Sequence, residues 1–295
     1  MPTMQPTDQK MTAAQFERIA EEVRQRSGIQ LPKGKEDLVQ GRLSRRIRIL
    51  GLAGFDEYLR YLARDESGAE LGAMIDALTT NVTSFFREPA HFTYLTEQVV
   101  PEAAQRGRRL RIWSAGCSNG AEPYTIAMTL RDAISDVSRW DIRILATDLS
   151  TTVLDTARKA EYPADVLRNV SPAVLRKHFT GVMGAEGNSY KVRDELTKMV
   201  TIGQLNLLGP WPMQSQFDAI FCRNVMIYFD RPTRAQLVDR YTKQLRPGGH
   251  LLVGHSESLS GMAPGLLYVQ PATYRRPDGN EASPGRTTTD KDIAG

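Results

Sequence analysis

The regular alternation of short apolar runs with helix-length segments after about residue 107 is the feature that most constrains the fold. The first two runs are LRIWSAG at 110–116 and DIRILATD at 141–148. Further runs of strand length occupy 199–205, 217–224 and 250–256. Strands that alternate with helices are typical of βαβ units, whose crossover helices make successive strands parallel. We therefore predict an α/β domain over residues 107–276, built on a doubly wound parallel sheet.

A helical period precedes this domain. Phe16, Ile19 and Val23 follow one another at three- and four-residue steps, and similar steps recur in the following segments. Thr12 followed by Gln15 fits a capping box at the start of the first helix. The pattern predicts a small all-helical unit at the N-terminal end of the chain.

Changes in composition and hydropathy along the chain predict the remaining domain boundaries. We predict that the all-helical domain occupies residues 12–80 and that a linker with a ligand lid occupies 81–106. The polar, glycine-rich stretch VMGAEGNSYKVRDELTK interrupts the strand–helix alternation, so we expect a short antiparallel hairpin inserted at about 180–200. The tail at 277–295 has almost no apolar residues, and we expect it to be disordered.

Length, charge and hydropathy narrow the function. The 295 residues carry 38 basic and 34 acidic side chains, and the formal net charge of +4 is too mild to indicate nucleic-acid binding. No run approaches the roughly 18 to 20 apolar residues of a membrane span, and the N-terminus lacks the apolar core of a secretory signal. We therefore expect a cytoplasmic protein without membrane insertion. The absence of a heptad repeat makes a monomer the expected state.

Neither cysteine has the neighbours of a metal ligand. Cys117 and Cys222 lie in apolar segments, without another cysteine or a histidine at metal-ligand spacing. We predict that both are buried, reduced thiols and that the protein holds no metal.

Four arginines crowd one short segment of the predicted helical domain: Arg42, Arg45, Arg46 and Arg48. A solvated basic helix face is the ordinary interpretation of such a run. The alternative is a surface that attracts an acidic partner.

Small residues follow the first predicted strand. The turn SAGCSNG contains Gly116, and a helix is expected to start near Glu122. The second strand ends in Asp148, where a carboxylate can accept both hydroxyls of a ribose. Together these features indicate an adenosine ligand. An ordinary strand–turn–helix junction with a helix-capping Asp148 is the alternative. A dinucleotide is disfavoured because the spacing is not G-x-G-x-x-G.

Polar residues also end a later strand. In FDAIFCRNVMIYF, Arg223 and Asn224 stand at the carboxyl end, where open α/β sheets bind their ligands, and Tyr228 follows. A Pro-Gly-Gly turn and a further strand come next, a layout that is frequent in S-adenosylmethionine methyltransferases. The alternative for Arg223 is a salt-bridged surface residue.

The stretch TTNVTSFFREPAHF at 79–92 lies between the two predicted domains. Asn81, Thr83 and Arg87 flank a pair of phenylalanines, which favours a ligand lid over a linker whose aromatics only dock on the core. The later phrase GHSES lacks the closing glycine of a nucleophile elbow, so we expect His255 to be structural.

Taken in order, TNVTSFFRE, WSAGCSNGAEPYTIAM, ATDLS, LNLL, FCRNVMIYF and GHSESL resemble the motifs of the chemotaxis receptor methyltransferases, the CheR family. The resemblance covers about residues 12–275. It implies an N-terminal helical domain, a Rossmann-like methyltransferase domain that binds S-adenosylmethionine, and a small inserted antiparallel β-subdomain. It also implies methyl transfer to the γ-carboxylate of receptor glutamates, which yields S-adenosylhomocysteine.

The resemblance also assigns residues. The positions that match the family's cofactor contacts are Asn81, Thr83, Arg87, Glu122, Asp148, Asn206, Leu207, Arg223 and Asn224. The small-residue turn itself adds Gly116 as a cofactor-binding candidate. Arg87 and Tyr228 match the positions expected at the reacting centre. One departure is Ala121, where family members often have a second acid before the proline.

The partners follow from the same resemblance. The cytoplasmic helical domain of a chemotaxis receptor would face the arginine cluster at 42–48, because receptor methylation segments are rich in glutamate. The inserted hairpin is a possible site for the receptor's C-terminal end, and membrane receptor arrays are the expected location. Two other functions stay open: methylation of RNA or of another protein, and a scaffold that senses the cofactor without turnover.

Overall fold

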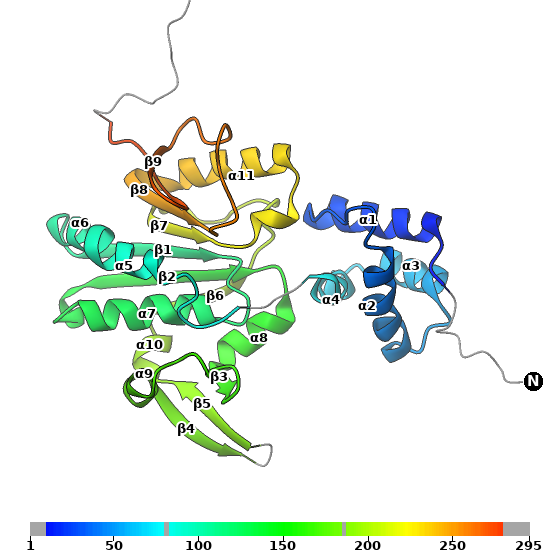
Figure 1. The fold of residues 1–295 in the computed structure, drawn as a ribbon, viewed down its shortest axis with the longest axis horizontal. Helices are drawn as coiled ribbons and strands as arrows, with labels where there is room; N and C mark the ends of the chain where they lie inside the picture. The colour runs from blue at the N-terminus through cyan, green and yellow to red at the C-terminus, as the bar shows by residue number, and fades with distance from the viewer. Residues whose placement is uncertain (1–9, 80–82, 185–186, 280–295) are drawn as a thin grey trace, which may run out of the picture.

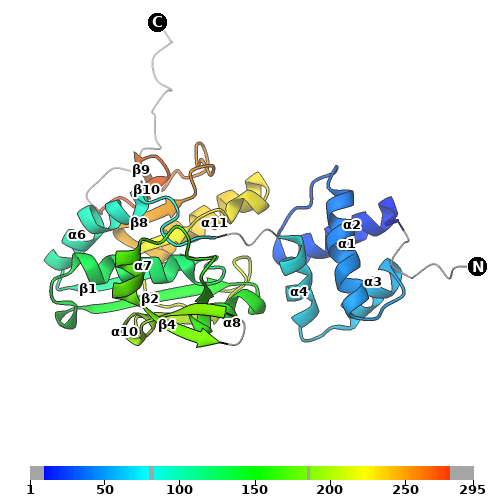
Figure 2. The same ribbon diagram turned by 60° about the horizontal axis from the view of Figure 1, so that its bottom comes forward.

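The N-terminal part of the chain is a compact helical layer. The computed structural model describes residues 10–79, 83–184 and 187–279. Its first helices are α1 (Ala13–Ser27), α2 (Glu36–Ile49), α3 (Phe55–Arg64) and α4 (Ala69–Leu78), drawn at one end of the molecule in Figures 1 and 2. The predicted helical unit is confirmed. So is the capping box, because Thr12 and Gln15 each accept a hydrogen bond from the other's backbone N–H at 3.2 and 2.9 Å.

A buried carboxylate ties three of these helices together. Glu70 of α4 is 4% exposed and accepts hydrogen bonds from the Tyr58 hydroxyl of α3 at 2.8 Å and from Nε of Arg46 of α2 at 3.0 Å. A buried charge of this kind is tolerated only when it is paired and hydrogen-bonded. Glu70 therefore fixes the mutual orientation of α2, α3 and α4.

The second part of the chain is a seven-stranded sheet in the order β6-β2-β1-β7-β8-β10-β9. Its strands are β1 (Arg109–Ala115), β2 (Asp141–Asp148), β6 (Val200–Gln204), β7 (Phe217–Cys222), β8 (Leu245–Val253), β9 (Leu267–Gln270) and β10 (Thr273–Arg275). The five strands from β6 to β8 are parallel, as predicted. The sheet as a whole is mixed, because β10 pairs antiparallel with both β8 and β9. The sequence analysis did not predict these two strands, which are short and interrupted by a register shift.

Helices cover both faces of the sheet. They are α5 (Ala90–Tyr94), α6 (Val100–Gln105), α7 (Ala121–Ala133), α8 (Thr151–Lys159) and α11 (Arg231–Gln244), and a π-helical turn joins α5 to α6. Alternate residues of β7 serve opposite faces. Ile220 and Cys222 pack with Tyr241 of α11, whereas Phe221 packs with the core that contains α7. Figure 1 shows α7 and α11 on opposite sides of the sheet.

A small antiparallel sheet is inserted after α8. Its strands β3 (Glu161–Pro163), β5 (Gly187–Val192) and β4 (Phe179–Gly184) lie in this order, and the short helices α9 (Pro172–His178) and α10 (Asp194–Thr197) flank it. The predicted hairpin is therefore confirmed as β4 and β5. Strand β3 was not predicted, because three residues carry too little periodicity to be recognised.

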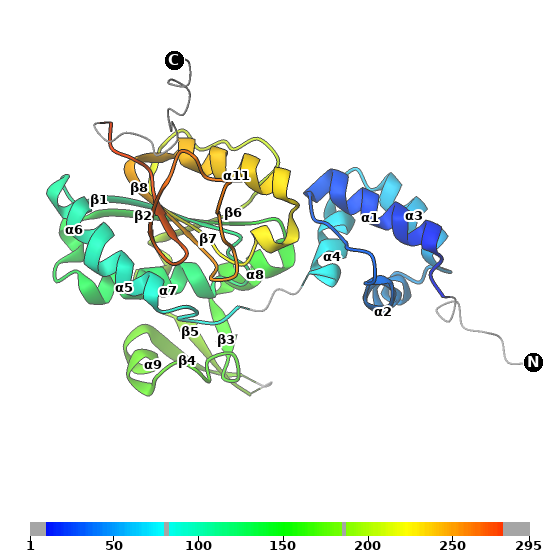
Figure 3. The same cartoon turned by 45° about the horizontal axis from the view of Figure 1, so that its top comes forward.

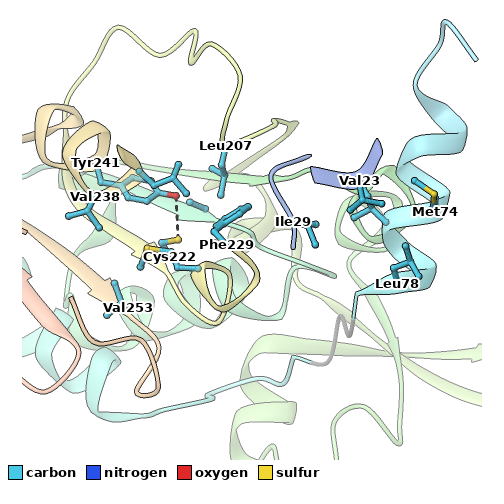
Figure 4. Packing of buried hydrophobic residues seen from close by; sticks show 14 of the residues in the cluster. Val23, Ile29, Met74, Leu78, Leu207, Cys222, Phe229, Val238, Tyr241 and Val253 are labelled. Carbon is cyan, nitrogen blue, oxygen red and sulfur yellow. Dashed lines mark hydrogen bonds between the residues drawn. The ribbon is translucent and has the colours of Figure 1, made fainter. Parts of the chain in front are cut away.

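The helical layer packs on the carboxyl ends of the parallel strands. Val23, Ile29 and Leu78 join one hydrophobic core with Leu207 and Phe229 of the sheet domain, as Figure 4 shows. Figure 3, which turns the molecule's top forward, shows α1 and α4 at the same end of the sheet. The helical domain thus supplies one wall to whatever lies at the strand ends.

Polar bonds join the same two parts. The backbone N–H of Gln30 donates to the backbone carbonyl of Tyr228 at 2.8 Å, and the side-chain amide of Asn206 donates to the backbone carbonyl of Arg26 at 2.7 Å. Because these bonds are directional, they fix how the two parts meet, whereas apolar contacts alone would leave the arrangement less specific. Within the described ranges no helix is long and apolar enough to cross a membrane.

Replacement of Glu70 by alanine should destabilise the helical domain by about 2 to 3 kcal/mol, because it leaves the Arg46 guanidinium and the Tyr58 hydroxyl without their shared acceptor. The partial exposure of Arg46 keeps the loss at the lower end of the range for buried pairs. Urea unfolding followed by circular dichroism measures it. The control is Glu66→Ala, an exposed acid of the same segment, which should change the free energy of unfolding by less than about 0.5 kcal/mol. Equal effects of the two substitutions would contradict the role given to Glu70.

Candidate functional site

A cleft opens at the carboxyl ends of the parallel strands, between the sheet and the helical layer. Its empty volume, up to the open mouth, is about 1020 Å³. Every predicted cofactor or catalytic residue that the structure describes lines it: Thr83, Arg87, Gly116, Glu122, Asp148, Asn206, Leu207, Arg223, Asn224 and Tyr228. Asn81 lies outside the described residues. Ser27, Ile29, Ile75 and Thr79 add a wall from the helical layer.

The turn after β1 brings backbone close to the cleft. Gly116 has a φ of 86°, and a Cβ atom there would lie 2.3 Å from a methyl group of Val225. Its N–H and that of Cys117 donate to the Thr147 carbonyl at 2.7 and 2.9 Å, which holds the turn against the end of β2. Only glycine satisfies both the backbone angle and the space. The glycine therefore lets the turn pack directly against Val225 of the loop after β7, and both residues line the cleft.

Asp148 ends β2 on the floor of the cleft. One carboxylate oxygen accepts the Ser118 N–H at 2.8 Å and the other accepts the Ser150 N–H at 3.1 Å. Burial raises the pKa of Asp148 above its usual value, and these backbone bonds oppose the rise. Each oxygen keeps a lone pair for a further donor, such as a hydroxyl of a bound sugar.

Glu122 stands in the first turn of α7. Its carboxylate accepts the Ser114 hydroxyl at 2.7 Å and pairs with the Arg223 guanidinium at 3.1 Å. Burial raises the pKa of Glu122, and Arg223 counteracts that effect. The predicted start of this helix is confirmed, since α7 begins at Ala121. The neighbouring Ala121 is fully buried and has no polar side chain, so this position adds no second carboxylate to the cleft.

Arg223 lies between two carboxylates. Besides Glu122 it contacts Glu88, with Nη2 and Nε at 3.2 and 3.3 Å from the same oxygen, and it also donates to the Arg87 carbonyl. Its side chain is only 3% exposed. The interpretation of Arg223 as a surface residue is therefore wrong. The guanidinium joins the end of β7, the start of α7 and the 83–88 segment into one unit.

The segment at 83–92 both docks on the core and lines the cleft. Phe85 is buried and contacts the rings of Tyr162 and Phe179 edge-on, at 5.0 and 5.5 Å between centroids. Thr83 and Arg87 of the same segment face the cleft. The aromatics therefore dock on the core, and they hold in place the polar residues that line the cleft. The role of this stretch as a ligand lid stays a prediction.

Left-handed backbone conformations gather around this site. Glu88, Asn224 and Ser118 have φ values of 55°, 59° and 50°. Such angles are uncommon for residues with a side chain and persist where surrounding contacts over-determine them. Each of these residues lies beside a segment that lines the cleft.

Glu257 is a residue that supports the site and that the sequence analysis missed. It is 2% exposed and accepts backbone N–H bonds from Asn224 and Gly254 at 2.7 Å each and from Ile227 at 3.1 Å. It thereby fastens the loop after β7 to the end of β8. An acid inside the phrase GHSES, at the carboxyl end of a buried strand, is the signal that could have identified it.

The loop after β6 has its own anchor. Arg240 of α11 stacks on Trp211 with 3.9 Å between the guanidinium carbon and the ring centre, and it donates to the carbonyls of Leu207 and Gly209 at 2.6 Å each. This fixes the wall formed by Asn206 and Leu207. Sequence reasoning placed these two residues in the site but did not find the arginine that holds them.

The four arginines of α2 divide into two pairs. Arg42 donates to the carbonyls of Leu78 and Thr79, and Arg46 pairs with Glu70, so both contribute to the fold. Arg45 and Arg48 are exposed. Only this second pair presents its full charge to solvent.

Two histidines meet behind Arg223. His91 is fully buried and its ring stacks on that of His255, which is exposed, with 5.4 Å between centroids. Burial, together with the nearby Arg223 charge, lowers the pKa of His91 to about 4, so its imidazole is neutral at physiological pH. Glu88 Oε2 lies 3.5 Å from Nδ1 of His91 and 3.6 Å from Nδ1 of His255.

The family models and the related proteins all indicate the same protein family. Residues 81–274 match the family described as "CheR methyltransferase, SAM binding domain", and residues 14–79 match "CheR methyltransferase, all-alpha domain". The chain is 44% identical over 240 residues to the probable chemotaxis protein methyltransferase of Rhizobium etli, covering 80% of this chain and 90% of the relative. It is 42% identical to the chemotaxis protein methyltransferase of Escherichia coli K12, covering 85% of this chain and 86% of the relative.

Solved structures give a weaker likeness. The N-methyltransferase NodS from Bradyrhizobium japonicum has a TM-score of 0.38 and 14% identity, covering 66% of this chain and 100% of that one. The sequence matches, not this likeness, carry the assignment.

Replacement of Glu257 by glutamine should lower the free energy of unfolding by about 1 to 3 kcal/mol. Both carboxylate oxygens accept N–H bonds, so the glutamine NH₂ group must face a backbone donor whichever way it turns. Thermal and urea unfolding measure the loss. Ser258→Ala, an exposed neighbour, is the control and should be neutral. Unchanged stability of the glutamine variant would show that Glu257 does not anchor the two loops.

Proposed function

The chain belongs to the CheR methyltransferase family, and from this premise we propose that it transfers a methyl group from S-adenosylmethionine to the γ-carboxylate of glutamates on chemotaxis receptors. The products are glutamyl methyl esters and S-adenosylhomocysteine. The observation that carries the proposal is the convergence of Arg87, Glu122, Asp148 and Arg223 on one cleft at the strand ends.

The residues present suit an S-adenosyl ligand. Asp148 would accept the ribose hydroxyls with the lone pairs that its backbone bonds leave. Glu122 would accept from the ligand's ammonium group, and Arg223 would face its carboxylate. Gly116 presents backbone without a side chain to the cleft, so a ligand can approach it closely. When bound, the ligand supplies a sulfonium methyl group as the electrophile.

The acceptor needs orientation rather than activation. A glutamate side chain has a pKa of about 4.3 and is already ionised at neutral pH, so attack on a methyl group requires no general base. Alignment of reactants can supply roughly 7 to 11 kcal/mol of the barrier lowering. Arg87 and Tyr228 both line the cleft. We assign Arg87 to orienting a carboxylate with its planar fork, and Tyr228 to donating a hydrogen bond near the reacting atoms.

The receptor's methylation helices would approach along α2. Arg45 and Arg48 are exposed there, and Leu38 and Ile49 of the same helix are 47% and 67% exposed. An exposed mixture of basic and apolar side chains matches a helix that presents glutamates beside apolar residues. Arg42 and Arg46 would contribute through their long-range field, since their donors already serve the fold.

The inserted sheet would provide a second receptor contact. Strand β4 lies at the edge of the order β3-β5-β4, and an edge strand can pair with an extended peptide. We propose that a receptor's C-terminal end binds there, which would concentrate the enzyme at membrane receptor arrays.

Replacement of Arg87 by alanine should lower kcat/KM for receptor methylation roughly 100-fold, because misplacement of the acceptor carboxylate removes the benefit of alignment. Lysine should recover only part of the activity, since it cannot hold a carboxylate in a planar fork. The assay is transfer of labelled methyl to a receptor cytoplasmic fragment, with alkaline release of the label as methanol. Arg143→Ala, an exposed arginine of β2, is the control. Tight cofactor binding without base-labile transfer to any receptor fragment would refute receptor glutamates as the substrate.

The double substitution Arg45→Ala/Arg48→Ala should raise KM for the receptor fragment roughly 2- to 30-fold and leave the affinity for S-adenosylmethionine unchanged, because the two charges lie outside the cleft. The wild type should lose activity as salt rises, and the double variant should lose less. Arg60→Ala, an exposed arginine on α3, is the matched control. Identical salt profiles for wild type and double variant would exclude α2 as the docking surface.

A further inference from the structure

We propose that Glu88, His91 and His255 form a binding site for one divalent transition-metal cation of the zinc class, beside the cleft. The three residues come from two distant parts of the sequence. Glu88 and His91 lie at the start of α5, and His255 follows the end of β8. The proposal departs from the expectation that the protein holds no metal, which rested on the spacing around the two cysteines, because none of these three ligands is a cysteine.

The donor atoms already stand near the distances that a metal requires. Glu88 Oε2 lies 3.5 Å from His91 Nδ1 and 3.6 Å from His255 Nδ1, and the three ligand atoms all lie within 4.8 Å of one another. Around a tetrahedral zinc ion with bonds of about 2.0 to 2.2 Å, neighbouring donors are about 3.3 to 3.6 Å apart. Two of the separations therefore fit. The third closes by a rotation of His255, which is exposed and free to make it.

An independent observation points to a missing ligand at His91. This ring is fully buried, yet neither of its nitrogens has a hydrogen-bond partner. The other two buried histidines each have at least one bonded ring nitrogen, although His178 Nδ1 also lacks a partner. His178 bonds Asp132 at 3.0 Å, and His250 bonds Tyr94 and Glu102 at 3.0 and 3.2 Å. Buried polar groups are normally bonded, and an exception calls for an explanation such as an ion. A neutral imidazole with a vacant lone pair is the form that binds metals.

Arg223 fits the surroundings of such a site. It contacts the same Glu88 oxygen that faces the two histidines, and hydrogen-bonded carboxylates are usual among metal ligands because the outer partner fixes their orientation. The backbone N–H of His255 donates a hydrogen bond to the other Glu88 oxygen at 3.4 Å. Glu122, on the far side of Arg223, offsets the guanidinium charge that would repel a cation.

The donor set selects the kind of cation. Two imidazoles and one carboxylate suit zinc, cobalt, nickel or copper, whereas magnesium and calcium prefer oxygen donors throughout. Three protein ligands leave a position open to water. His255 provides the route of entry, because its side chain is 50% exposed.

The test uses the full chain without an affinity tag, stripped with a chelator and titrated with Co²⁺, then with Zn²⁺ as a competitor. We expect one equivalent of Co²⁺ to give the visible d–d absorption of a four- or five-coordinate site, without thiolate-to-metal charge-transfer bands. Zn²⁺ should displace the Co²⁺. His255→Ala should weaken binding at least about tenfold, as should Glu88→Gln. His255 is exposed, so its substitution leaves the core intact.

The matched controls are Ser256→Ala, on the same loop, and His178→Gln, a histidine outside the cluster. Both should bind Co²⁺ like the wild type, and circular dichroism verifies that each variant is folded. No stoichiometric binding of Co²⁺ or Zn²⁺ by the wild type would overturn the proposal. Equal affinity in the wild type and in folded His255→Ala would do so as well, because the cation would then lie elsewhere.

Discussion

The site depends on the two ion pairs that Arg223 makes with Glu88 and Glu122. One guanidinium with five donors contacts two largely buried carboxylates and a backbone carbonyl from two segments, which it joins to the end of β7. Removal of Arg223 would leave two largely buried carboxylates without their cationic partner, which costs several kcal/mol. The network therefore acts as a unit, and the cleft inherits its shape and its balance of charge from that unit.

Around this network the strand ends are held by buried side chains that bond to backbone. Glu257 gathers N–H groups from two loops, and Arg240 gathers carbonyls from a third. Loops fixed in this way need no secondary structure of their own, and they can hold left-handed residues such as Asn224. The parallel sheet supplies a rigid base, and these two side chains turn its irregular ends into defined walls.

Much of this architecture was predictable because it depends on local patterns. Buried strands of a parallel sheet are continuous apolar runs, and their carboxyl ends mark the cleft, so Asp148, Arg223 and Gly116 could be assigned from the sequence. Strands β3, β9 and β10 could not, because three or four residues carry no clear period. The roles of Glu70, Glu257 and the His91–His255 pair depend on contacts across 12 to 167 positions, as the bonds of Glu70 and Glu88 show. The arginines of α2 look alike in sequence, and only the fold separates those that pair internally from those that are exposed.

The helical layer and one face of the sheet share a hydrophobic core, and Ile75 and Thr79 from the former and Asp148 from the latter also line a common cavity. A small molecule bound there touches both, and its binding free energy is added to the cohesion between them. Occupancy should therefore raise the midpoint of thermal unfolding and strengthen the coupling between the two parts. The stability of the contact between the two parts is in this way linked to whether the cleft is filled.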